Sequence, residues 1–321
     1  MPKLITLEPT NHCNLKCPLC PTGVGDASVE YGLFKLDKYK KVVDVFGKWA
    51  QTVQLFSWGE PLLNKSFVEM VRYASQNPHK IRSVTTVNLN IITDEQIKGL
   101  LTSDLDALTV SIDGTTQEVY EKYRVGGSLE VVFNNLKKLI AAKKLYKANT
   151  KINWAFLVFK HNEHQVEEAK KMASDFGISI TIKEARPDIK GDLQNSLDEW
   201  KTMIDTYGEW LPDNPKYNAY NMDAKTRKTN FSYNYGTRQK PLKFCKRPWW
   251  QTFINWNGDV FPCDCVHTEE KYRMGNIFEQ DFKEIWNGEK YVAARKELLD
   301  QPNDLDTICH TCKKNGFYST L

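Results

Sequence analysis

The amino-acid sequence predicts an α/β fold in which an open, partial (β/α)6 barrel over residues 1–185 precedes a small cysteine-rich module over residues 245–321. In the first part, short apolar runs alternate with amphipathic stretches six times, which indicates a parallel sheet with right-handed helical crossovers. A closed barrel of this kind has eight such units, so six leave the barrel open. The module is indicated by five of the chain's 8 cysteines, which follow a long stretch without any.

Apolar patterning and helix start signals place the individual elements. The six predicted strands span residues 4–7, 52–56, 83–87, 107–112, 152–159 and 178–182. The predicted helices between them span residues 36–49, 66–74, 93–101, 129–142 and 166–176. In the first of these helices, apolar side chains from Val42 to Trp49 recur on one face. Ser66 is a candidate N-cap of the second, and Thr93 with Gln96 fits a capping box at the start of the third.

Residues 186–244 interrupt this alternation of strands and helices. The stretch is polar and rich in tyrosine and tryptophan, without a clear succession of strands. We expect it to be either a connecting segment or a lid that faces the substrate.

Composition and charge restrict the class of protein. Hydrophobic residues make up 41% and charged residues 26%, which is typical of a folded globular protein. The formal net charge of +4 is well below that of a dedicated nucleic-acid-binding domain, so we expect no nucleic-acid partner. The chain has no apolar stretch of transmembrane length and no signal peptide, so we expect a cytoplasmic protein without a membrane partner. In that compartment, closely spaced cysteines indicate metal or redox sites rather than disulfides.

The first cysteine group follows the first predicted strand directly. Cys13, Cys17 and Cys20 have the spacing C-x3-C-x2-C, which lets three thiolates surround one face of a compact metal centre. Soft thiolates select zinc or iron–sulfur clusters. A structural zinc site needs four ligands, and His12 is a weak candidate for the fourth. Three ligands on a [4Fe–4S] cluster leave one iron open to a substrate or cofactor.

This spacing, placed after a strand and before a βα array, resembles the radical S-adenosylmethionine (radical SAM) superfamily. The resemblance implies that the three cysteines hold a [4Fe–4S] cluster whose open iron is chelated by S-adenosylmethionine. It also implies cleavage of that cofactor to methionine and a 5′-deoxyadenosyl radical, which abstracts a hydrogen atom from the substrate. An aromatic residue commonly precedes the third cysteine in this superfamily. Leu19 stands there in this chain, and we expect it to pack against the adenine.

Two further motifs strengthen the resemblance. Trp58-Gly59-Glu60-Pro61 is similar to the G-G-E-P motif, which implies that Gly59 and Glu60 bind the amino group of the cofactor's methionine part. Ser111-Ile112-Asp113-Gly114 is similar to the S-x-D-G motif, which implies that Ser111 contacts the cofactor's ribose or carboxylate. Because side chains alternate along a strand, we expect Asp113 to point toward the barrel mouth with Ser111.

Other polar residues near the predicted strand ends are weaker candidates. Arg124 lies in a Y-R-x-G-G stretch and either neutralises the cofactor's carboxylate or fixes the entry of the next helix. Asn88 ends the third strand, where many members of the superfamily have Thr-Asn-Gly, so it is a candidate cofactor contact. We expect Asn162 to cap a helix, while Glu184 and Arg186 either face the substrate or form a structural ion pair.

The second cysteine group consists of Cys245, Cys263, Cys309 and Cys312. A strong hairpin signal, Asn257-Gly258, lies between two apolar runs and brings Cys245 and Cys263 toward the same end. The Cys309-x2-Cys312 pair then completes a four-thiolate site. Ligand type alone leaves both zinc and an iron–sulfur cluster possible.

The sequence around these cysteines resembles a SPASM/twitch domain. The resemblance rests on C-K-R-P-W, which begins at Cys245, on N-G-D-V-F-P-C, which ends at Cys263, and on the later M-G-N-I and E-I-W segments. It implies one auxiliary [4Fe–4S] cluster held by the four cysteines. Cys265 is then left over, either as a spare thiol or as a hydrogen-atom donor to a substrate radical.

These features favour a radical SAM enzyme that oxidises or epimerises a small polar substrate such as a sugar or aminocyclitol. We expect an electron donor such as flavodoxin or ferredoxin. A small substrate is favoured over a peptide because no leader-binding domain precedes Cys13. The alternatives are a peptide-modifying radical SAM maturase and, from another class, a non-enzymatic zinc or iron–sulfur protein.

Overall fold

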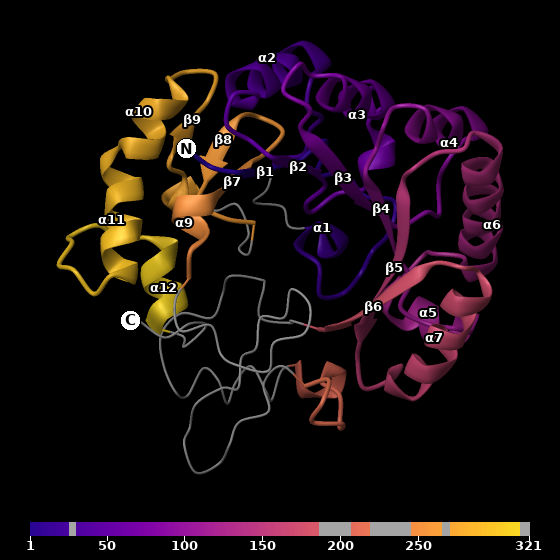
Figure 1. Cartoon of the computed structure of the whole chain (residues 1–321). Helices are drawn as coiled ribbons and strands as arrows, with labels where there is room; N and C mark the ends of the chain where they lie inside the picture. Colours follow the sequence, from indigo (N-terminus) through magenta and orange to yellow (C-terminus); the bar gives the residue numbers. More distant parts are fainter. Residues whose placement is uncertain (26–29, 186–206, 219–244, 265–269, 315–321) are drawn as a thin grey trace.

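The computed structural model describes residues 1–25, 30–185, 207–218, 245–264 and 270–314. Its centre is a curved nine-stranded sheet with the strand order β6-β5-β4-β3-β2-β1-β7-β8-β9, and helices cover the convex side (Figure 1). The predicted (β/α)6 partial barrel is confirmed, because β1 to β6 pair with one another in parallel and in sequence order. Strand–helix alternation forces this arrangement, since a parallel pair requires a long crossover.

The elements have the following bounds. The strands are β1 (Leu4–Leu7), β2 (Thr52–Leu55), β3 (Arg82–Val87), β4 (Ala107–Ser111), β5 (Lys151–Val158), β6 (Ser179–Glu184), β7 (Gln251–Ile254), β8 (Asp259–Phe261) and β9 (Gly275–Asn276). The helices are α1 (Pro21–Val24), α2 (Leu36–Phe46), α3 (Phe67–Ser75), α4 (Asp94–Leu101), α5 (Gln117–Tyr123), α6 (Leu129–Leu145), α7 (Val166–Asp175), α9 (Arg247–Trp250), α10 (Phe282–Asn287), α11 (Glu289–Leu298) and α12 (Ile308–Lys314).

Most predicted elements match these bounds closely. The capping box at the start of α4 is confirmed, because the Gln96 N–H donates to Thr93 Oγ1 and the Thr93 N–H donates to Gln96 Oε1. Ser66 lies at the N-cap of α3, but its side chain makes no cap hydrogen bond. Helix α2 ends at Phe46, before Trp49, and α5 is a short helix that the apolar pattern does not predict.

The two faces of the barrel sheet differ in their surroundings. Side chains directed toward the helices are buried, as Leu108, Val110 and Trp154 show. Side chains of the alternate positions, including Thr86, Thr109 and Asn153, stay half-exposed on the concave face. The paired register β3–β4–β5 puts these three residues on neighbouring strands of one face. The concave face is therefore polar and accessible, as a binding site requires.

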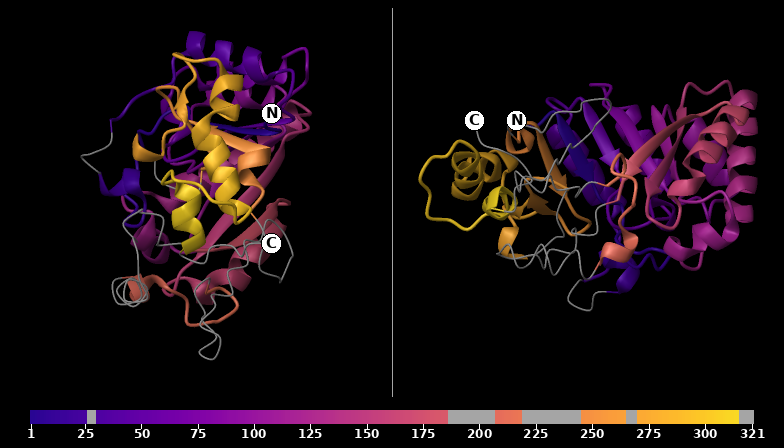
Figure 2. Two further views of the ribbon diagram at one scale, coloured as in Figure 1. Left: turned by 90° about the vertical axis from the view of Figure 1, so that its left-hand side faces the viewer. Right: turned by 90° about the horizontal axis from the view of Figure 1, so that it is seen from below.

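The cysteine-rich module continues the barrel sheet instead of forming a separate layer. Strand β7 pairs in parallel with β1, matching Leu4 with Gln251 and Leu7 with Ile254. The predicted hairpin follows as the antiparallel pair β7–β8, with Gly258 at a φ of 93° in the turn. Pairing with β7 covers the β1 edge, which a six-stranded sheet would leave exposed. Figure 2 shows this module and the β4–β6 half of the barrel at opposite ends of the molecule.

Of the stretch predicted to connect the two parts, the structure describes only residues 207–218. This piece lies on the loop after β5, where the Lys160 N–H donates to the Trp210 carbonyl oxygen at 3.1 Å and the Asn214 N–H donates to Glu163 Oε2 at 3.0 Å. Arg186 and Cys265 lie outside the described residues, and so does most of the expected lid.

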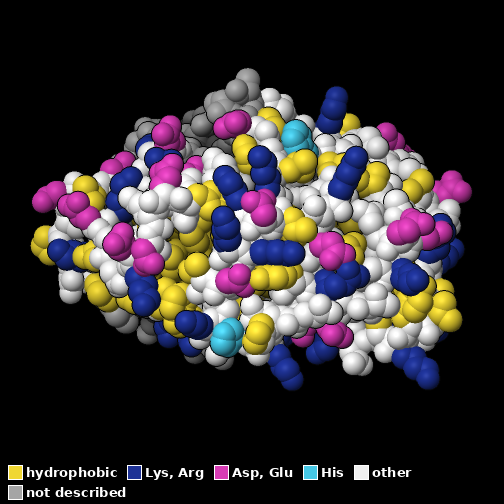
Figure 3. All heavy atoms as spheres, turned by 90° about the horizontal axis from the view of Figure 1, so that it is seen from above, with side chains coloured by type: hydrophobic (Ala, Val, Ile, Leu, Met, Phe, Trp, Pro, Cys, Tyr) yellow, Lys and Arg dark blue, Asp and Glu magenta, His cyan; other side chains and the backbone are white. Residues whose placement is uncertain are grey.

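The described surface carries charges of both signs. On the face shown in Figure 3, lysine and arginine side chains are interspersed with aspartate and glutamate side chains. That face therefore has no continuous basic stripe among its described residues, the feature expected of a nucleic-acid-binding surface. Within the described part of the chain, no helix has the length and apolarity needed to cross a membrane.

Candidate functional site

A cavity of about 310 Å³ lies at the carboxyl ends of the barrel strands, where parallel α/β folds place their chemistry. It collects most of the residues that the sequence singled out. The predicted residues that line it are Cys13, Cys17, Leu19, Cys20, Gly59, Glu60, Asn88, Ser111, Arg124 and Glu184. Residues from the ends of five strands, or from the segments that follow them, thus meet at one place, although up to 171 positions separate them in the sequence.

The loop between β1 and α1 presents three thiols to this cavity. Cys17 is buried, while Cys13 and Cys20 are half-buried. The loop folds back tightly, because the Cys20 N–H donates to the Cys17 carbonyl oxygen at 3.1 Å. Burial raises the pKa of Cys13 to about 12 and also raises that of Cys17. Three thiols facing one cavity, one of them buried and two half-buried, fit a cationic metal cluster, which would stabilise their thiolate form.

Gly59 is required where it stands because two loops approach each other closely. A Cβ atom at this position would lie 2.1 Å from the Thr10 carbonyl oxygen and 2.7 Å from that of His12. The next residue continues the contact, since the Glu60 N–H donates to the His12 carbonyl oxygen at 2.8 Å. The G-E-P turn after β2 therefore lies directly against the cysteine loop and fixes its position.

The Glu60 carboxylate is buried at the wall of the cavity. Oε2 accepts a hydrogen bond from the Asn88 N–H at 2.6 Å, and Oε1 accepts one from the Leu62 N–H at 3.2 Å. Desolvation by burial raises the pKa of Glu60 to about 7 against the opposing effect of these two bonds. A buried carboxylate without a cationic contact within 4 Å among the described residues suits a positively charged group of a ligand.

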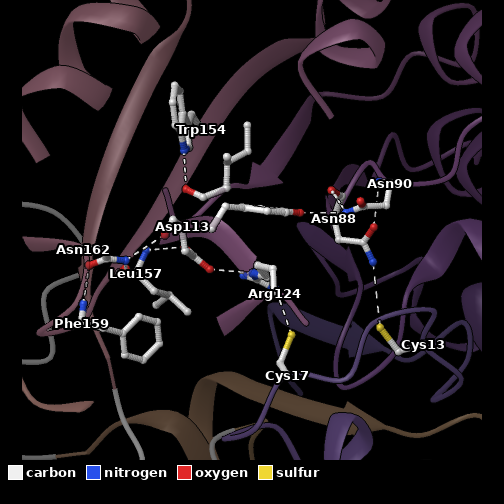
Figure 4. Close-up of polar contacts among 12 residues, drawn as sticks. Cys13, Cys17, Asn88, Asn90, Asp113, Arg124, Trp154, Leu157, Phe159 and Asn162 are labelled. Atoms are coloured by element: carbon white, nitrogen blue, oxygen red, sulfur yellow. Dashed lines mark hydrogen bonds and ion pairs between the residues drawn. The ribbon is translucent and has the colours of Figure 1, made fainter. Parts of the chain in front are cut away.

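Asn88 joins the end of β3 to the cysteine loop. Its Nδ2 donates to Asn14 Oδ1 at 2.8 Å. The same nitrogen lies 4.0 Å from Cys13 Sγ (Figure 4). The same residue orients Glu60 through its backbone N–H. Asn88 therefore contacts both the thiol site and the carboxylate.

The structure corrects the expected direction of the Asp113 side chain. Asp113 is fully buried and does not line the cavity; its Oδ2 accepts from Arg124 Nε at 2.6 Å. The same-face argument was wrong because β4 ends at Ser111, so side-chain alternation does not extend to Asp113. Ser111 itself lines the cavity as expected. Arg124 also lines the cavity, and its Nη1 lies 3.9 Å from Cys17 Sγ.

Asn162 occupies the N-cap position of the short 3-10 helix Glu163–Gln165, as the sequence suggested. Its side chain makes no cap hydrogen bond; instead Nδ2 donates to the carbonyl oxygens of Asp113 and Leu157, both at 2.9 Å. Asn162 thus ties the end of β4 to the end of β5. Glu184, at the end of β6, is half-buried at the cavity wall, and burial raises its pKa.

An aromatic cluster beside the thiols was missed at the sequence level. The ring centroids of Tyr123 and Phe159 lie 4.3 Å apart, and Trp210 packs at 5.7 Å from Phe159. Tyr123 and Phe159 line the cavity, while Trp210 comes from the segment between the two parts of the chain. The richness of that segment in aromatic residues was the only available signal.

The four cysteines of the second group lie in the C-terminal module. Cys263 and Cys309 are buried, and Cys245 and Cys312 are half-buried. Burial raises the pKa of Cys309, and the nearby thiols of Cys312 and Cys245 raise it further. Tyr291 lies close to both Cys263 and Cys309 and so links the pairs. Cys245, Cys309 and Cys312 are thus neighbours, with Cys263 across Tyr291, although among the described residues no three of the four stand close enough to form a ready-made metal site.

Comparison with known proteins agrees with this geometry. Residues 7–173 match the family model of the radical SAM superfamily, and residues 245–313 match SPASM, an iron–sulfur cluster-binding domain. The AdoMet-dependent heme synthase of Methanosarcina barkeri is 26% identical over 97% of this chain and 88% of that protein. The mycofactocin maturase MftC of Mycobacterium tuberculosis is 28% identical over 65% of this chain and 52% of that protein.

The fold also resembles solved structures. Streptococcus suis SuiB bound to precursor peptide SuiA aligns with a TM-score of 0.64 at 15% identity, over 92% of this chain and 67% of that chain. The radical SAM match spans just over half of the 321 residues and includes the thiol loop and the G-E-P turn. The chain belongs to the radical SAM superfamily, carries a C-terminal SPASM domain, and is an enzyme whose cofactors are S-adenosylmethionine, a [4Fe–4S] cluster and auxiliary iron–sulfur chemistry.

Proposed function

We propose that Cys13, Cys17 and Cys20 hold the [4Fe–4S] cluster and that S-adenosylmethionine binds in the adjoining cavity. When bound, these two groups supply a 5′-deoxyadenosyl radical after one-electron reduction by a donor such as flavodoxin or ferredoxin. The proposal is supported by the three thiols that face the cavity together. Replacing any one of them by alanine should abolish formation of 5′-deoxyadenosine.

The cavity wall offers a partner for each part of the cofactor. Glu60 binds the ammonium group, since it is a buried carboxylate beside the thiols. Arg124 and Ser111 serve the carboxylate or ribose, and Leu19 packs against the adenine. Gly59 and Asn88 hold the surrounding loops in place through the close approach and hydrogen bonds described above.

The second group, Cys245, Cys263, Cys309 and Cys312, is proposed to hold one auxiliary [4Fe–4S] cluster. All four ligands are protein thiolates, so this cluster relays an electron and does not bind S-adenosylmethionine. In this proposal Cys265 stays outside the ligand set, as a spare thiol or a hydrogen-atom donor. Cys265→Ala should then retain the full iron content, whereas Cys309→Ala should lose part of it.

For the substrate, we propose a peptide rather than a small sugar or aminocyclitol. The observation that carries this choice is the size of the cavity, about 310 Å³, which is at the lower end for small-molecule sites. S-adenosylmethionine would take up much of that space, which leaves the neighbouring face of the sheet to bind the substrate. The half-exposed polar face of β3 to β5 continues beyond it and offers hydrogen-bonding groups to a chain. The maturase MftC and the peptide-bound SuiB, which this chain resembles, point the same way.

A tetrapyrrole is the second candidate, favoured by the similarity to AdoMet-dependent heme synthases over nearly the whole chain. The peptide and tetrapyrrole proposals are distinguished by an assay with the reconstituted enzyme under anaerobic conditions. Three kinds of labelled candidate substrate are offered: tetrapyrroles, aminocyclitols, and short peptides that are encoded next to the gene of this enzyme. Transfer of deuterium from a labelled peptide into 5′-deoxyadenosine supports the peptide. Transfer only from a tetrapyrrole or aminocyclitol would contradict it.

A further inference from the structure

A buried ion pair lies immediately behind the thiol loop. Arg124 Nε donates to Asp113 Oδ2 at 2.6 Å, with only 14% of the arginine side chain and none of the aspartate side chain exposed (Figure 4). Asp113 lies just after β4 and Arg124 just after α5, where the arginine lines the cavity. Burial by itself would lower the pKa of Arg124, but the neighbouring Asp113 carboxylate outweighs it and raises the pKa, so the guanidinium stays charged.

The positive end of this pair is directed at the cysteine loop. Arg124 Nη1 donates to Cys17 Sγ at 3.9 Å, while Nε is occupied by Asp113. Cys13 Sγ accepts from two neutral donors instead, the Leu15 N–H at 3.5 Å and Asn88 Nδ2 at 4.0 Å. Among the described residues, Arg124 is the cation that contacts a thiol of this loop.

The arginine is fixed in this direction from several sides. Asp113 Oδ1 accepts from the Leu157 N–H at 2.7 Å, and its backbone carbonyl oxygen accepts from Asn162 Nδ2 at 2.9 Å. The Arg124 guanidinium also lies over the Tyr123 ring at 5.2 Å. Because β4 and β5 both hold the aspartate, the guanidinium cannot turn away from Cys17 without breaking a buried ion pair.

Hydrogen bonds and charges near ligand sulfurs tune the reduction potential of an iron–sulfur cluster. A cation stabilises the reduced form, which carries one more negative charge. From this geometry we infer that Arg124 raises the reduction potential of the first cluster through Cys17, and that Asp113 is the positioning residue that holds Arg124 there. The inference rests on the proposed assignment of Cys17 as a cluster ligand.

The test measures the midpoint potential of the reconstituted enzyme by anaerobic titration followed by electron paramagnetic resonance. The signal of the first cluster is identified by its change when S-adenosylmethionine is added. Arg124→Gln should make reduction about tenfold less favourable, a shift of about 59 mV to more negative potential for a one-electron couple. Arg124→Lys, which keeps the charge, should shift less than Arg124→Gln. Arg273→Gln, which breaks the ion pair with Asp259 in the C-terminal module, should leave the potential unchanged.

Asp113→Asn separates positioning from simple charge neutralisation. If Asp113 holds the arginine, its loss releases Arg124 and the potential shifts to more negative values, as in Arg124→Gln. A shift to more positive values would mean that Asp113 only screens a guanidinium that stays in place, which overturns its positioning role. An unchanged potential in Arg124→Gln would overturn the inference as a whole.

The proposed ligand assignment is checked separately by the same spectroscopic signal in a cysteine variant. Cys17→Ala should lose the signal that responds to S-adenosylmethionine. Retention of that signal in Cys17→Ala would refute the assignment of Cys17, and with it the basis of the inference. A lost signal in Cys17→Ala with an unchanged potential in Arg124→Gln would refute only the role of the arginine.

Discussion

Glu60 offers the most direct test of how the cavity binds S-adenosylmethionine. Its two carboxylate oxygens accept from the Asn88 and Leu62 N–H groups at 2.6 and 3.2 Å, and the side chain is fully buried. Glu60→Gln removes the negative charge and turns an NH2 group toward one of these donors. A hydrogen bond to a charged group contributes about 1.5–3 kcal/mol. We therefore expect S-adenosylmethionine to bind about 10- to 150-fold more weakly in this variant.

The assay is anaerobic calorimetric titration of the reconstituted protein with S-adenosylmethionine. Iron content is measured on the same samples, so that a lost cluster is not mistaken for a lost contact. Glu184→Gln is the matched control, because it removes a carboxyl group that lines the same cavity from the end of β6. We expect less than a threefold effect from the control. Wild-type affinity in Glu60→Gln, with iron retained, would mean that this carboxylate only ties the loops after β2 and β3 together.

Three other changes test the same reasoning. Gly59→Ala should lower iron content and S-adenosylmethionine cleavage by at least tenfold, because its Cβ would lie 2.1 Å from the Thr10 carbonyl oxygen; normal loading would show that the loop yields easily. Cys309→Ala should lower total iron and substrate turnover yet leave uncoupled cofactor cleavage, measured as 5′-deoxyadenosine; loss of all cleavage would contradict separate clusters. In the apoprotein, burial raises the pKa of Glu8 to about 7, above its unfolded value, so the protein should lose stability as pH rises from about 4.5 to 7. Glu8→Gln should remove up to roughly 3 kcal/mol of that loss in urea unfolding, and an unchanged pH profile would show that Glu8 is not its source.

The strands, the order of the barrel and the chemistry of both cysteine groups could be predicted from sequence because they depend on local information. Apolar periodicity gives strands and helices, and alternation of the two implies a parallel sheet with its chemistry at one edge. The C-x3-C-x2-C spacing lies within one loop, so its three thiols are bound to be neighbours. The Asn257-Gly258 turn specifies its hairpin in the same local way, and the structure has that hairpin.

Contacts between distant segments were decided only by the tertiary structure. The pairing of β7 with β1 turns two expected units into one sheet, and it depends on an exposed strand edge that no local pattern reveals. Asp113 illustrates the same limit within the site. Its sequence neighbours suggested a side chain facing the cofactor, but β4 ends two residues earlier, and burial next to Arg124 determines where the carboxylate points. Sequence thus determined which groups this site contains, while packing determined which of them face the cavity and which hold the others in place.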